Sequence, residues 1–400
     1  MTTPLLLLAA PSRESRDKAA HFSAAATALG IPARVLVADR SEQIMINDAA
    51  RGHYIFVLAC SDALAEAAAM LNARCGVAAL AAPLAARLVD KASGIPLLSD
   101  LLDLPLLPQM VPRTAAELLA WSYVGPVIAK PACSAGGWSP RPWGYRCFDH
   151  AAALFDWLEA EGLTKAFFAE QCRPGPLGPV VLQAAVDGDR IEGAAMLLTA
   201  GAGTVYARCH AEFEVETQSG QGRRWWRATY HAAAASILAE RLPRLARLIG
   251  RVPGWNRGLL HVQGIVTPGG FCLTDINQRL PTPWDWLIAQ VDPSFHRRLL
   301  ASLLFDEPFD PVWPAPAMAI DLVYGPSGRA IKRIDHPPPG DGVMPWRLDA
   351  ADCAVPRHGF DKAGQAPGFI TLGGNAEECA RRAEAFRAGL DITYALEQAA

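Results

Sequence analysis

The chain has 400 residues, of which 51% are hydrophobic, and a formal net charge of -3 at pH 7. This length suits two or three domains, and the small negative charge provides no basic field for nucleic acid, so we expect small-molecule partners. The 9 cysteines are scattered without a CxxC pair, which argues against a disulfide framework or a zinc site and favours a cytoplasmic protein. The apolar run at 5–10 is too short for a signal peptide or a membrane span.

Strands and helices alternate at the start of the chain. Apolar runs predict strands at 4–10, 33–39 and 54–60, and helices are expected at 15–30 and after Ser61. This alternation is typical of a small α/β unit with a parallel sheet. The turn after the first strand, APSRES, contains no glycine, so the dinucleotide-binding fingerprint is missing and we do not expect a nicotinamide site.

Lysines mark the next two elements. The helical pattern LVDKASG contains Lys91, and the apolar run VGPVIAKP predicts a strand that ends at Lys130. A loop of small residues with Gly136 and Gly137 follows Lys130. Two lysines can neutralise the phosphates of a nucleotide, and a glycine loop can close over them with backbone N–H groups. For each residue taken alone, a solvated lysine or an ordinary turn is the competing interpretation.

The segment after this loop predicts a helix followed by three strands. A helix at about 149–162 precedes KAFFAEQC, which we interpret as a strand that ends in Glu170 and Gln171 just before Arg173. Asp187-Gly188 then predicts a hairpin between VVLQAAV and IEGAAMLL.

Basic and aromatic residues cluster in the polar segment that follows. Arg223, Arg224 and Arg227 lie beside Trp225 and Trp226, a combination that can bind a carboxylate and stack on a ring. The alternative is a surface loop with two packed tryptophans. A helix at about 232–249 is expected next.

A hairpin closes the main body of the chain. Its strands are LLHVQGIV and FCLTDINQR, joined by a Pro-Gly-Gly turn. Alternation places Asp275, Asn277 and Arg279 on one strand face, where a carboxylate and an amide oxygen can bind Mg²⁺ and the arginine an anion. A polar face that simply meets water is the competing interpretation. Beyond Phe305 we expect another hairpin around 325–328 and a C-terminal helix from about Asn375.

The chain from residue 1 to about 300 resembles the ATP-grasp superfamily of carboxylate-amine ligases. The resemblance lies in the order of four elements: the DK helix, the lysine strand with its glycine loop, the Glu170 strand and the final acid-x-Asn-x-Arg hairpin. The resemblance implies an α/β (α+β) ATP-grasp fold that uses ATP and Mg²⁺ to form an amide through an acyl-phosphate. It implies an N-terminal Rossmann-like pre-ATP-grasp domain at 1–85, a helical connector at 86–123, a lid subdomain at 124–200, a C-terminal subdomain at 201–304 and an extension at 305–400.

The resemblance also implies roles for single residues. Lys91 and Lys130 would contact ATP phosphates or the adenine edge, with Gly136 and Gly137 in the covering loop. The hinge that receives adenine would contain Glu170, Gln171 and Arg173. Asp275 and Asn277 would bind Mg²⁺, and Arg279 would steady the transferred phosphoryl group.

The sequence departs from the family pattern near the expected metal. Family members usually carry a second metal-binding acid on the strand LLHVQGIV, where the nearest polar residues here are His261 and Gln263. A neutral amide is a weaker Mg²⁺ ligand than a carboxylate. Asp285 is a candidate substitute, and Asp275 is one methylene shorter than the usual glutamate.

The sequence gives the least information about the substrates. The extension after Phe305 resembles that of ATP-grasp proteins of one-carbon-metabolising bacteria, which are associated with methanopterin-type or methylofuran cofactors. That resemblance implies addition of glutamate to an aromatic amine or to tyrosine, with Arg223, Arg224, Arg227 and Trp225 at the substrate. A non-catalytic nucleotide-binding protein and an enzyme with a non-amine acceptor remain as alternatives.

Overall fold

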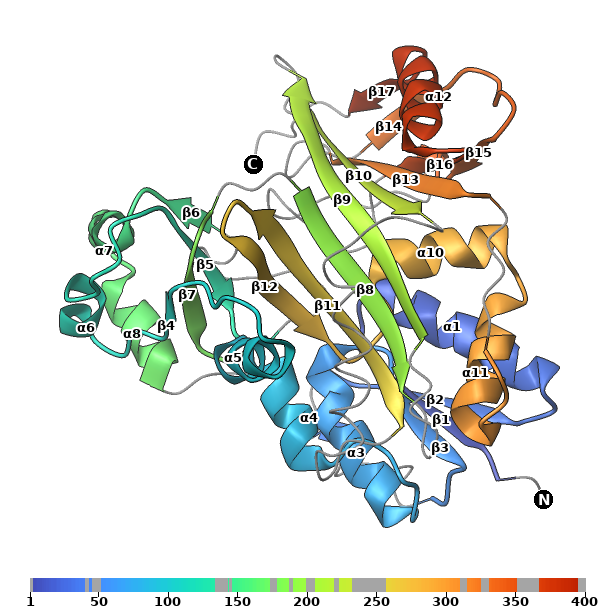
Figure 1. Cartoon of the computed structure of the whole chain (residues 1–400), viewed down its shortest axis with the longest axis horizontal. Helices are drawn as coiled ribbons and strands as arrows, with labels where there is room; N and C mark the ends of the chain where they lie inside the picture. Colours follow the sequence, from blue (N-terminus) through green and yellow to red (C-terminus); the bar gives the residue numbers. More distant parts are fainter. Residues whose placement is uncertain are drawn as a thin grey trace.

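A computed structural model of the chain describes residues 3–39, 43–44, 52–133, 143, 146–172, 178–186, 190–198, 206–218, 223–231, 257–309, 315–324, 331–350 and 367–394. Within them, one large sheet crosses the centre of the molecule, with a small sheet and its helices to one side and a parallel sheet below (Figure 1).

The N-terminal unit has the predicted alternation of strands and helices. Its parallel sheet has the order β2-β1-β3. The elements are β1 (Leu5–Ala9), α1 (Arg13–Ala28), β2 (Ala33–Val37), β3 (Phe56–Ala59), the 3-10 turn η2 (Asp62–Leu64) and α3 (Ala65–Arg74). Ser12 caps α1 by accepting a hydrogen bond from the Ser15 N–H, and Gly30 follows the helix at φ +70°, which a glycine adopts without strain.

Two helices connect this unit to the rest of the chain. They are α4 (Ala82–Val89) and α5 (Lys91–Leu102). Leu88, Ile95 and Leu98 are fully buried against the apolar residues of the final hairpin, including Val262 and Leu273. This contact holds the start of α5 next to the hairpin.

A four-stranded antiparallel sheet with the order β4-β7-β5-β6 forms the unit on the left of Figure 1. Its strands are β4 (Gln109–Met110), β5 (Val127–Pro131), β6 (Arg146–Phe148) and β7 (Val180–Ala184), and its helices are α6 (Ala115–Leu119), α7 (Ala151–Ala160) and α8 (Thr164–Cys172). The predicted lysine strand is therefore confirmed as β5.

The segment KAFFAEQC is a helix, so the predicted strand there is wrong. Helix α8 covers Thr164–Cys172 and packs Phe167 into the core of this unit, edge-on to Trp143. Ala, Lys, Glu and Gln favour helix, and burial of Phe167 and Gln171 at helical spacing decides the outcome over the β propensity of the two phenylalanines.

The hairpin expected around Asp187-Gly188 is also wrong. Strand β7 pairs with β4 and β5, whereas β8 (Arg190–Leu198) pairs with β9 and β11 in the central sheet. The two runs are adjacent in sequence, but each finds its partners elsewhere, so the chain crosses between sheets there. Residues 187–189 lie outside the described part.

Among the described residues, the central sheet has eight strands in the order β12-β11-β8-β9-β10-β13-β16-β15, all paired antiparallel. Its remaining strands are β9 (Tyr206–Gln218), β10 (Arg223–His231), β11 (Gly258–Thr267), β12 (Gly270–Asn277), β13 (Ala317–Tyr324), β15 (Val343–Trp346) and β16 (Gly368–Gly373). The predicted β11–β12 hairpin is confirmed. The helix expected at 232–249 lies outside the described residues.

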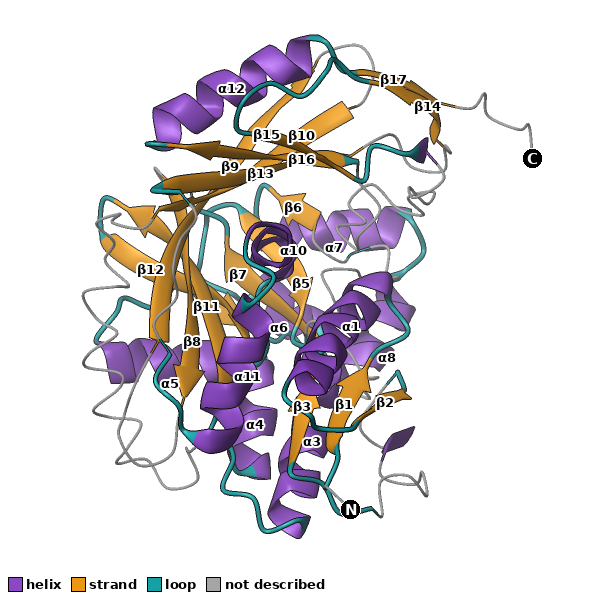
Figure 2. Cartoon of the chain, turned by 90° about the vertical axis from the view of Figure 1, so that its right-hand side faces the viewer, coloured by secondary structure: helices purple, strands orange, loops and turns teal. Residues whose placement is uncertain are grey.

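Helices and a small two-stranded sheet complete the fold. They are α10 (Thr282–Val291), α11 (Phe295–Phe305), α12 (Ala376–Ala388), β14 (Ile331–Asp335) and β17 (Asp391–Tyr394). Figure 2 shows α10 and α11 beside α1, and α12 above β13 and β16. The hairpin expected around 325–328 is wrong, because β13 pairs with β10 and β16 while β14 pairs with β17. The C-terminal helix is confirmed, with Asn375 as its N-cap.

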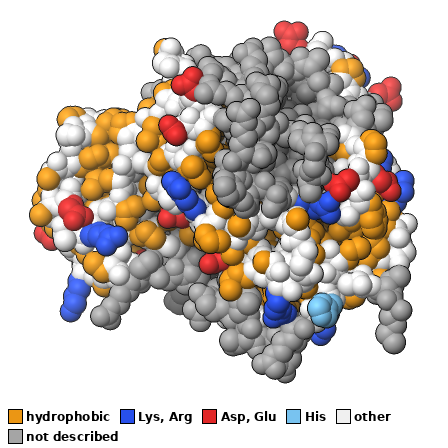
Figure 3. Space-filling view, turned by 60° about the horizontal axis from the view of Figure 1, so that its bottom comes forward, with side chains coloured by type: hydrophobic (Ala, Val, Ile, Leu, Met, Phe, Trp, Pro, Cys, Tyr) orange, Lys and Arg blue, Asp and Glu red, His pale blue; other side chains and the backbone are white. Residues whose placement is uncertain are grey.

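The surface offers two further observations. None of the helices in the described ranges is long and apolar enough to cross a membrane. On the face shown in Figure 3, separate acidic and basic side chains are scattered among apolar and uncharged atoms.

The division of the chain into five segments at 85, 123, 200 and 304 remains a prediction.

Candidate functional site

The end of strand β12 carries the residues of the expected metal face. A bulge at Thr274 interrupts the pairing with β11, so that Gln263 lies opposite Asp275 and Thr274 is an extra residue. Bulges change the direction of a strand's polar groups. Here the carbonyl oxygen of Thr274 accepts a hydrogen bond from Nζ of Lys130 at 2.6 Å.

Lys130 connects the four-stranded sheet to this bulge. Its Nζ also donates to Oε1 of Gln183 at 2.7 Å, across the β5–β7 pair, and the residue is 5% exposed. Burial lowers the pKa of Lys130 to about 7, and Lys91 adds to this effect whereas Asp275 opposes it. The ammonium group therefore loses its proton near neutral pH unless an anion approaches it.

Lys91 reaches the same strand from the start of α5. The Asp90 side chain caps this helix, and the Lys91 N–H donates to the carbonyl oxygen of Ala132, which directly follows β5. Nζ of Lys91, which is buried, lies 3.1 Å from Oδ1 of Asp275, whose side chain is 29% exposed. Burial raises the pKa of Asp275, but Lys91 and Lys130 outweigh burial, and the net pKa is lowered. Asp275 is thus a carboxylate with a path to solvent.

Asn277 and Arg279 continue the polar face beyond Asp275. Oδ1 of Asn277 accepts a hydrogen bond from Nη2 of Arg279 at 3.3 Å, and Nδ2 of Asn277 lies 3.2 Å from Nδ1 of His261 on β11. Arg279 follows the end of β12, yet its side chain returns to the same side as Asn277. The structure therefore brings together Asp275, Asn277 and Arg279 as predicted from their spacing.

Arg279 is also bound by the N-terminal unit. Its Nε donates to Oδ2 of Asp62 at 2.9 Å, and its Nη1 lies 3.6 Å from Oε1 of Glu14. Burial opposes the charge of Arg279, but Asp62 and Glu14 outweigh it and raise its pKa. Asp62 also accepts from the backbone N–H of Gln278 at 2.8 Å. These contacts hold the guanidinium group in one orientation.

The sequence-based prediction did not include several residues that the structure places at this site. Thr274 contributes a backbone oxygen, so no side-chain pattern could indicate it. Gln183 lies in a run whose pairing was predicted wrongly. Asp62 and Glu14 follow the carboxyl ends of β3 and β1, and that position in a parallel sheet is a general signal for polar sites that could have been used.

The residues expected at the adenine hinge have a different setting. Gln171 lies in α8, where its side chain accepts from the Val180 N–H at 2.7 Å and donates to the Val180 carbonyl oxygen at 3.2 Å. Glu170 is half-buried on the same helix. The expectation that these residues end a strand is wrong because the segment is helical. Arg173, and the loop residues Gly136 and Gly137, lie outside the described residues.

The predicted substrate residues lie on β10, four strands from β12 in the central sheet. At a strand spacing of about 4.8 Å, this is roughly 19 Å across the sheet. Nε of Arg227 donates to Oδ1 of the fully buried Asp321 on β13 at 2.9 Å. The structure therefore does not bring Arg227 to Asp275. Of Arg223, Arg224 and Trp225, only the backbone is described.

Asp285 does not join the metal face. Its carboxylate is fully buried between His21 on α1, at 3.0 Å, and His296 on α11, at 2.7 Å. Asp285 is therefore held by two imidazoles, and the suggestion that it replaces the missing metal-binding acid is not supported by its contacts.

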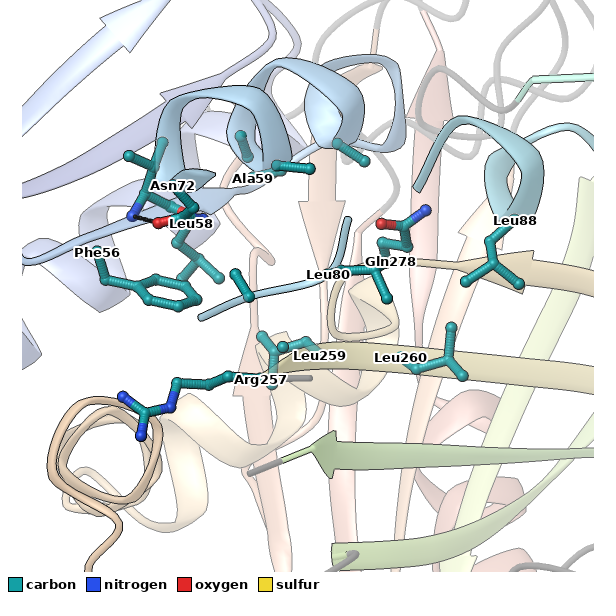
Figure 4. Close-up of a pocket in the computed structure, with 16 residues that line it drawn as sticks. Phe56, Leu58, Ala59, Asn72, Leu80, Leu88, Arg257, Leu259, Leu260 and Gln278 are labelled. Carbon is teal, nitrogen blue, oxygen red and sulfur yellow. Dashed lines mark hydrogen bonds between the residues drawn. The ribbon is translucent and has the colours of Figure 1, made fainter. Parts of the chain in front are cut away.

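A small cavity lies elsewhere, between β3, α3 and the start of β11 (Figure 4). Phe56, Leu58, Leu259 and Leu260 are among the side chains that line it. Its volume of about 40 Å³ is enough for a few water molecules and not for a nucleotide. The cavity is a packing gap between the N-terminal unit and the central sheet.

Comparison with known proteins gave a clear result only at the level of structure. No family model matches the sequence, and a search of curated proteins found no match. Among solved structures, the L-amino acid ligase from Bacillus licheniformis is similar, with 13% identity and a TM-score of 0.66, covering 99% of this chain and 100% of the ligase.

Two other similar structures contain nucleotide. The ADP complex of N5-carboxyaminoimidazole ribonucleotide synthetase has 12% identity and a TM-score of 0.63, with 96% of both chains covered. The biotin carboxylase domain of 2-oxoglutarate carboxylase from Hydrogenobacter thermophilus, in complex with MgADP and bicarbonate, has 13% identity and a TM-score of 0.63, covering 98% of this chain and 91% of that domain. The described elements and these full-length matches show that the chain has the ATP-grasp fold.

Proposed function

We propose that this protein is an ATP-dependent ligase that joins a carboxylate to an amine, with release of ADP and phosphate. The observation that carries the proposal is the convergence of two lysines from different elements, Lys91 on α5 and Lys130 on β5, beside Asp275 of β12. The similar structures named above include ligases, which supports this reaction class.

The donor set at the end of β12 fits Mg²⁺. Asp275 offers a partly exposed carboxylate and Asn277 an amide oxygen, and hard oxygen donors are the ligands that Mg²⁺ prefers. In the free protein the Lys91 ammonium group lies at this carboxylate. Mg²⁺, when bound, would neutralise charge on the phosphates of ATP. Lys91 and Lys130 would hold the phosphate oxygens of a bound nucleotide by charge-assisted hydrogen bonds.

Arg279 would stabilise the charge of the group in transfer. Asp62 and Glu14 hold its guanidinium in place, which is the preorganisation that transition-state stabilisation needs. The chemistry requires no protein nucleophile, because ATP phosphorylates the substrate carboxylate and the amine attacks the resulting acyl-phosphate. Positioning and neutralisation of charge are the protein's tasks.

We further propose glutamate as the carboxylate and an aromatic amine or tyrosine as the acceptor, in the synthesis of a one-carbon cofactor in the cytoplasm. The support is the sequence resemblance of the C-terminal extension and the basic, aromatic segment of β10. Because Arg227 is paired with Asp321, this proposal depends chiefly on Arg223, Arg224 and Trp225.

A second candidate function is nucleotide binding without catalysis. The observation that favours it is the neutral Gln263 opposite Asp275 on β11, where a second metal-binding acid would complete a stronger site.

The first experiment is a screen for ADP release by the full chain with Mg-ATP, testing carboxylates and amines singly and in pairs. Hydroxylamine should trap an acyl-phosphate as a hydroxamate only when the correct carboxylate and ATP are both present. Asp275→Asn should reduce ADP formation by at least 100-fold, an order-of-magnitude expectation for a lost metal ligand and charge. Asp335→Asn on β14, which removes the charge of a half-exposed surface acid, is the matched control and should keep full activity.

Tight ATP binding with neither ADP nor hydroxamate across a broad screen would favour the non-catalytic candidate. Full activity of a folded Asp275→Asn protein would remove β12 from the site.

A further inference from the structure

Three helices that are far apart in the sequence share one buried polar cluster. Asp285, in the first turn of α10, lies between His21 on α1 and His296 on α11, and Figure 2 shows these three helices side by side. Nδ1 of His21 lies 3.0 Å from Oδ2 of Asp285, and Nε2 of His296 lies 2.7 Å from Oδ1. The two imidazoles therefore flank one carboxylate.

The carboxylate of Asp285 takes its compensating charge from the cluster itself: burial raises the pKa of Asp285, but His296 and His21 outweigh burial, and the net pKa is lowered. The carboxylate is fully buried, and within the described residues its ion pairs are with these two histidines alone. Two cationic side chains on or near α1 pair with other acids. Lys18 pairs with Glu14 at 2.8 Å, and Arg347 pairs with Asp17. A buried carboxylate is strongly unfavourable unless positive charge compensates it, and two protonated imidazoles or a bound cation can both do so.

The geometry of the cluster suits a metal ion. One ligand atom from each of the three residues lies within 4.8 Å of the other two. A tetrahedral ion with bonds of about 2.1 Å places its ligand atoms roughly 3.4 Å apart, so each imidazole nitrogen would move slightly away from its carboxylate oxygen, from 3.0 and 2.7 Å. The His21 side chain is 27% exposed, whereas those of Asp285 and His296 are buried, so the His21 side is the one from which an ion would approach.

We propose that His21, Asp285 and His296 bind one divalent transition-metal ion, with Zn²⁺ as the best match. Two imidazoles and a carboxylate with an open fourth position form a donor set for Zn²⁺ and related ions, whereas Mg²⁺ prefers oxygen ligands alone. The site shares no residue with the face formed by Asp275, Asn277 and Arg279. The ion ties α1, near the start of the chain, to α10 and α11 and does not depend on the proposed ligase activity.

The test uses the full chain after removal of metals with a chelator. Co²⁺ is titrated in the presence of excess Mg²⁺, and binding is followed by the visible absorption of four-coordinate Co²⁺ and by displacement with Zn²⁺. We expect one ion per chain, no displacement by Mg²⁺ and a rise in Tm on addition of Zn²⁺.

Two variants make the test specific. His21→Ala removes the partly exposed ligand, and we expect at least a 100-fold weaker affinity and loss of the Zn²⁺-dependent shift in Tm, as an order-of-magnitude estimate for losing one of three ligands. His53→Ala removes an exposed imidazole elsewhere and should bind as the wild type does.

The absence of saturable binding to the wild-type chain would overturn the proposal without any variant and would identify the cluster as a hydrogen-bonded clasp. Equal affinity of wild type and folded His21→Ala would overturn it as well, because the ion would then be bound elsewhere.

Discussion

At the scale of single residues, the burial of Lys130 controls whether its side chain is charged. The side chain is held by two oxygen acceptors, Oε1 of Gln183 and the carbonyl oxygen of Thr274, that carry no full negative charge. Desolvation by burial therefore dominates, and the pKa falls to about 7. A bound triphosphate would supply the missing negative charge and raise the pKa again.

We therefore expect ATP binding to be linked to proton uptake by Lys130. Above pH 7 the free lysine is increasingly neutral, so binding should take up a proton, and affinity should fall by up to tenfold for each pH unit until the pKa of the bound form is reached. Calorimetry at pH 8 in buffers of different ionisation enthalpy measures this uptake. Lys130→Met should abolish it, and equal uptake by the variant would assign the proton to another group.

At the scale of elements, the β11–β12 hairpin carries the proposed metal-binding residues, and its bulge sets their direction. Gly264 lies just beside the bulge, and a Cβ there would lie 2.2 Å from the backbone oxygen of Cys272 and 2.5 Å from Cζ of Phe271. Only glycine permits this close approach. The hairpin itself was predictable because its turn and its alternation are local, whereas the bulge depends on contacts across the pair.

Gly264→Ala should destabilise the hairpin. We expect a loss of about 2 kcal/mol or more in the free energy of unfolding, because a backbone oxygen must move to admit the methyl group. Gly258→Ala, at the start of the same strand, is the control, since no atom lies within 4 Å of its added Cβ. Urea denaturation of the two variants measures the difference, and equal stabilities would contradict the close approach.

At the scale of the whole molecule, buried ion pairs join the start of the chain to the end of β12. Arg279 contacts Asp62 and Glu14 from the N-terminal unit, and Gln278 donates from its Nε2 to the carbonyl oxygen of Ala85 at 2.5 Å. The N-terminal parallel sheet therefore positions the guanidinium group that the proposed reaction uses. Removal of Asp62 would leave the buried guanidinium group with the more distant Glu14, at 3.6 Å, as its carboxylate partner.

Asp62→Asn should therefore reduce both stability and activity. We expect a loss of about 3 to 5 kcal/mol in the free energy of unfolding, because Arg279 keeps its charge in a buried position. Asp306→Asn is the matched control, since it weakens the more exposed pair with Arg257 and should cost less than about 1 kcal/mol. Urea denaturation compares the two variants. Similar losses in the free energy of unfolding would mean that the buried Asp62–Arg279 pair stabilises the protein no more than the more exposed Asp306–Arg257 pair does.

The sequence by itself determined the features that depend on neighbouring residues. The parallel N-terminal unit, the strand that ends at Lys130 and the final hairpin with Asp275, Asn277 and Arg279 were all predictable, because strand alternation and turns are encoded within short segments. The resemblance to ATP-grasp ligases follows from the order of these local patterns.

Only the tertiary structure decided the features that depend on distant partners. Helix α8 forms because Phe167 is buried in its unit, and β7 and β8 separate because each pairs with strands from other parts of the chain. The pairing of Arg279 with Asp62, and the cluster around Asp285, join residues more than 200 positions apart. No local pattern encodes such contacts, because they arise from the burial of whole elements against one another.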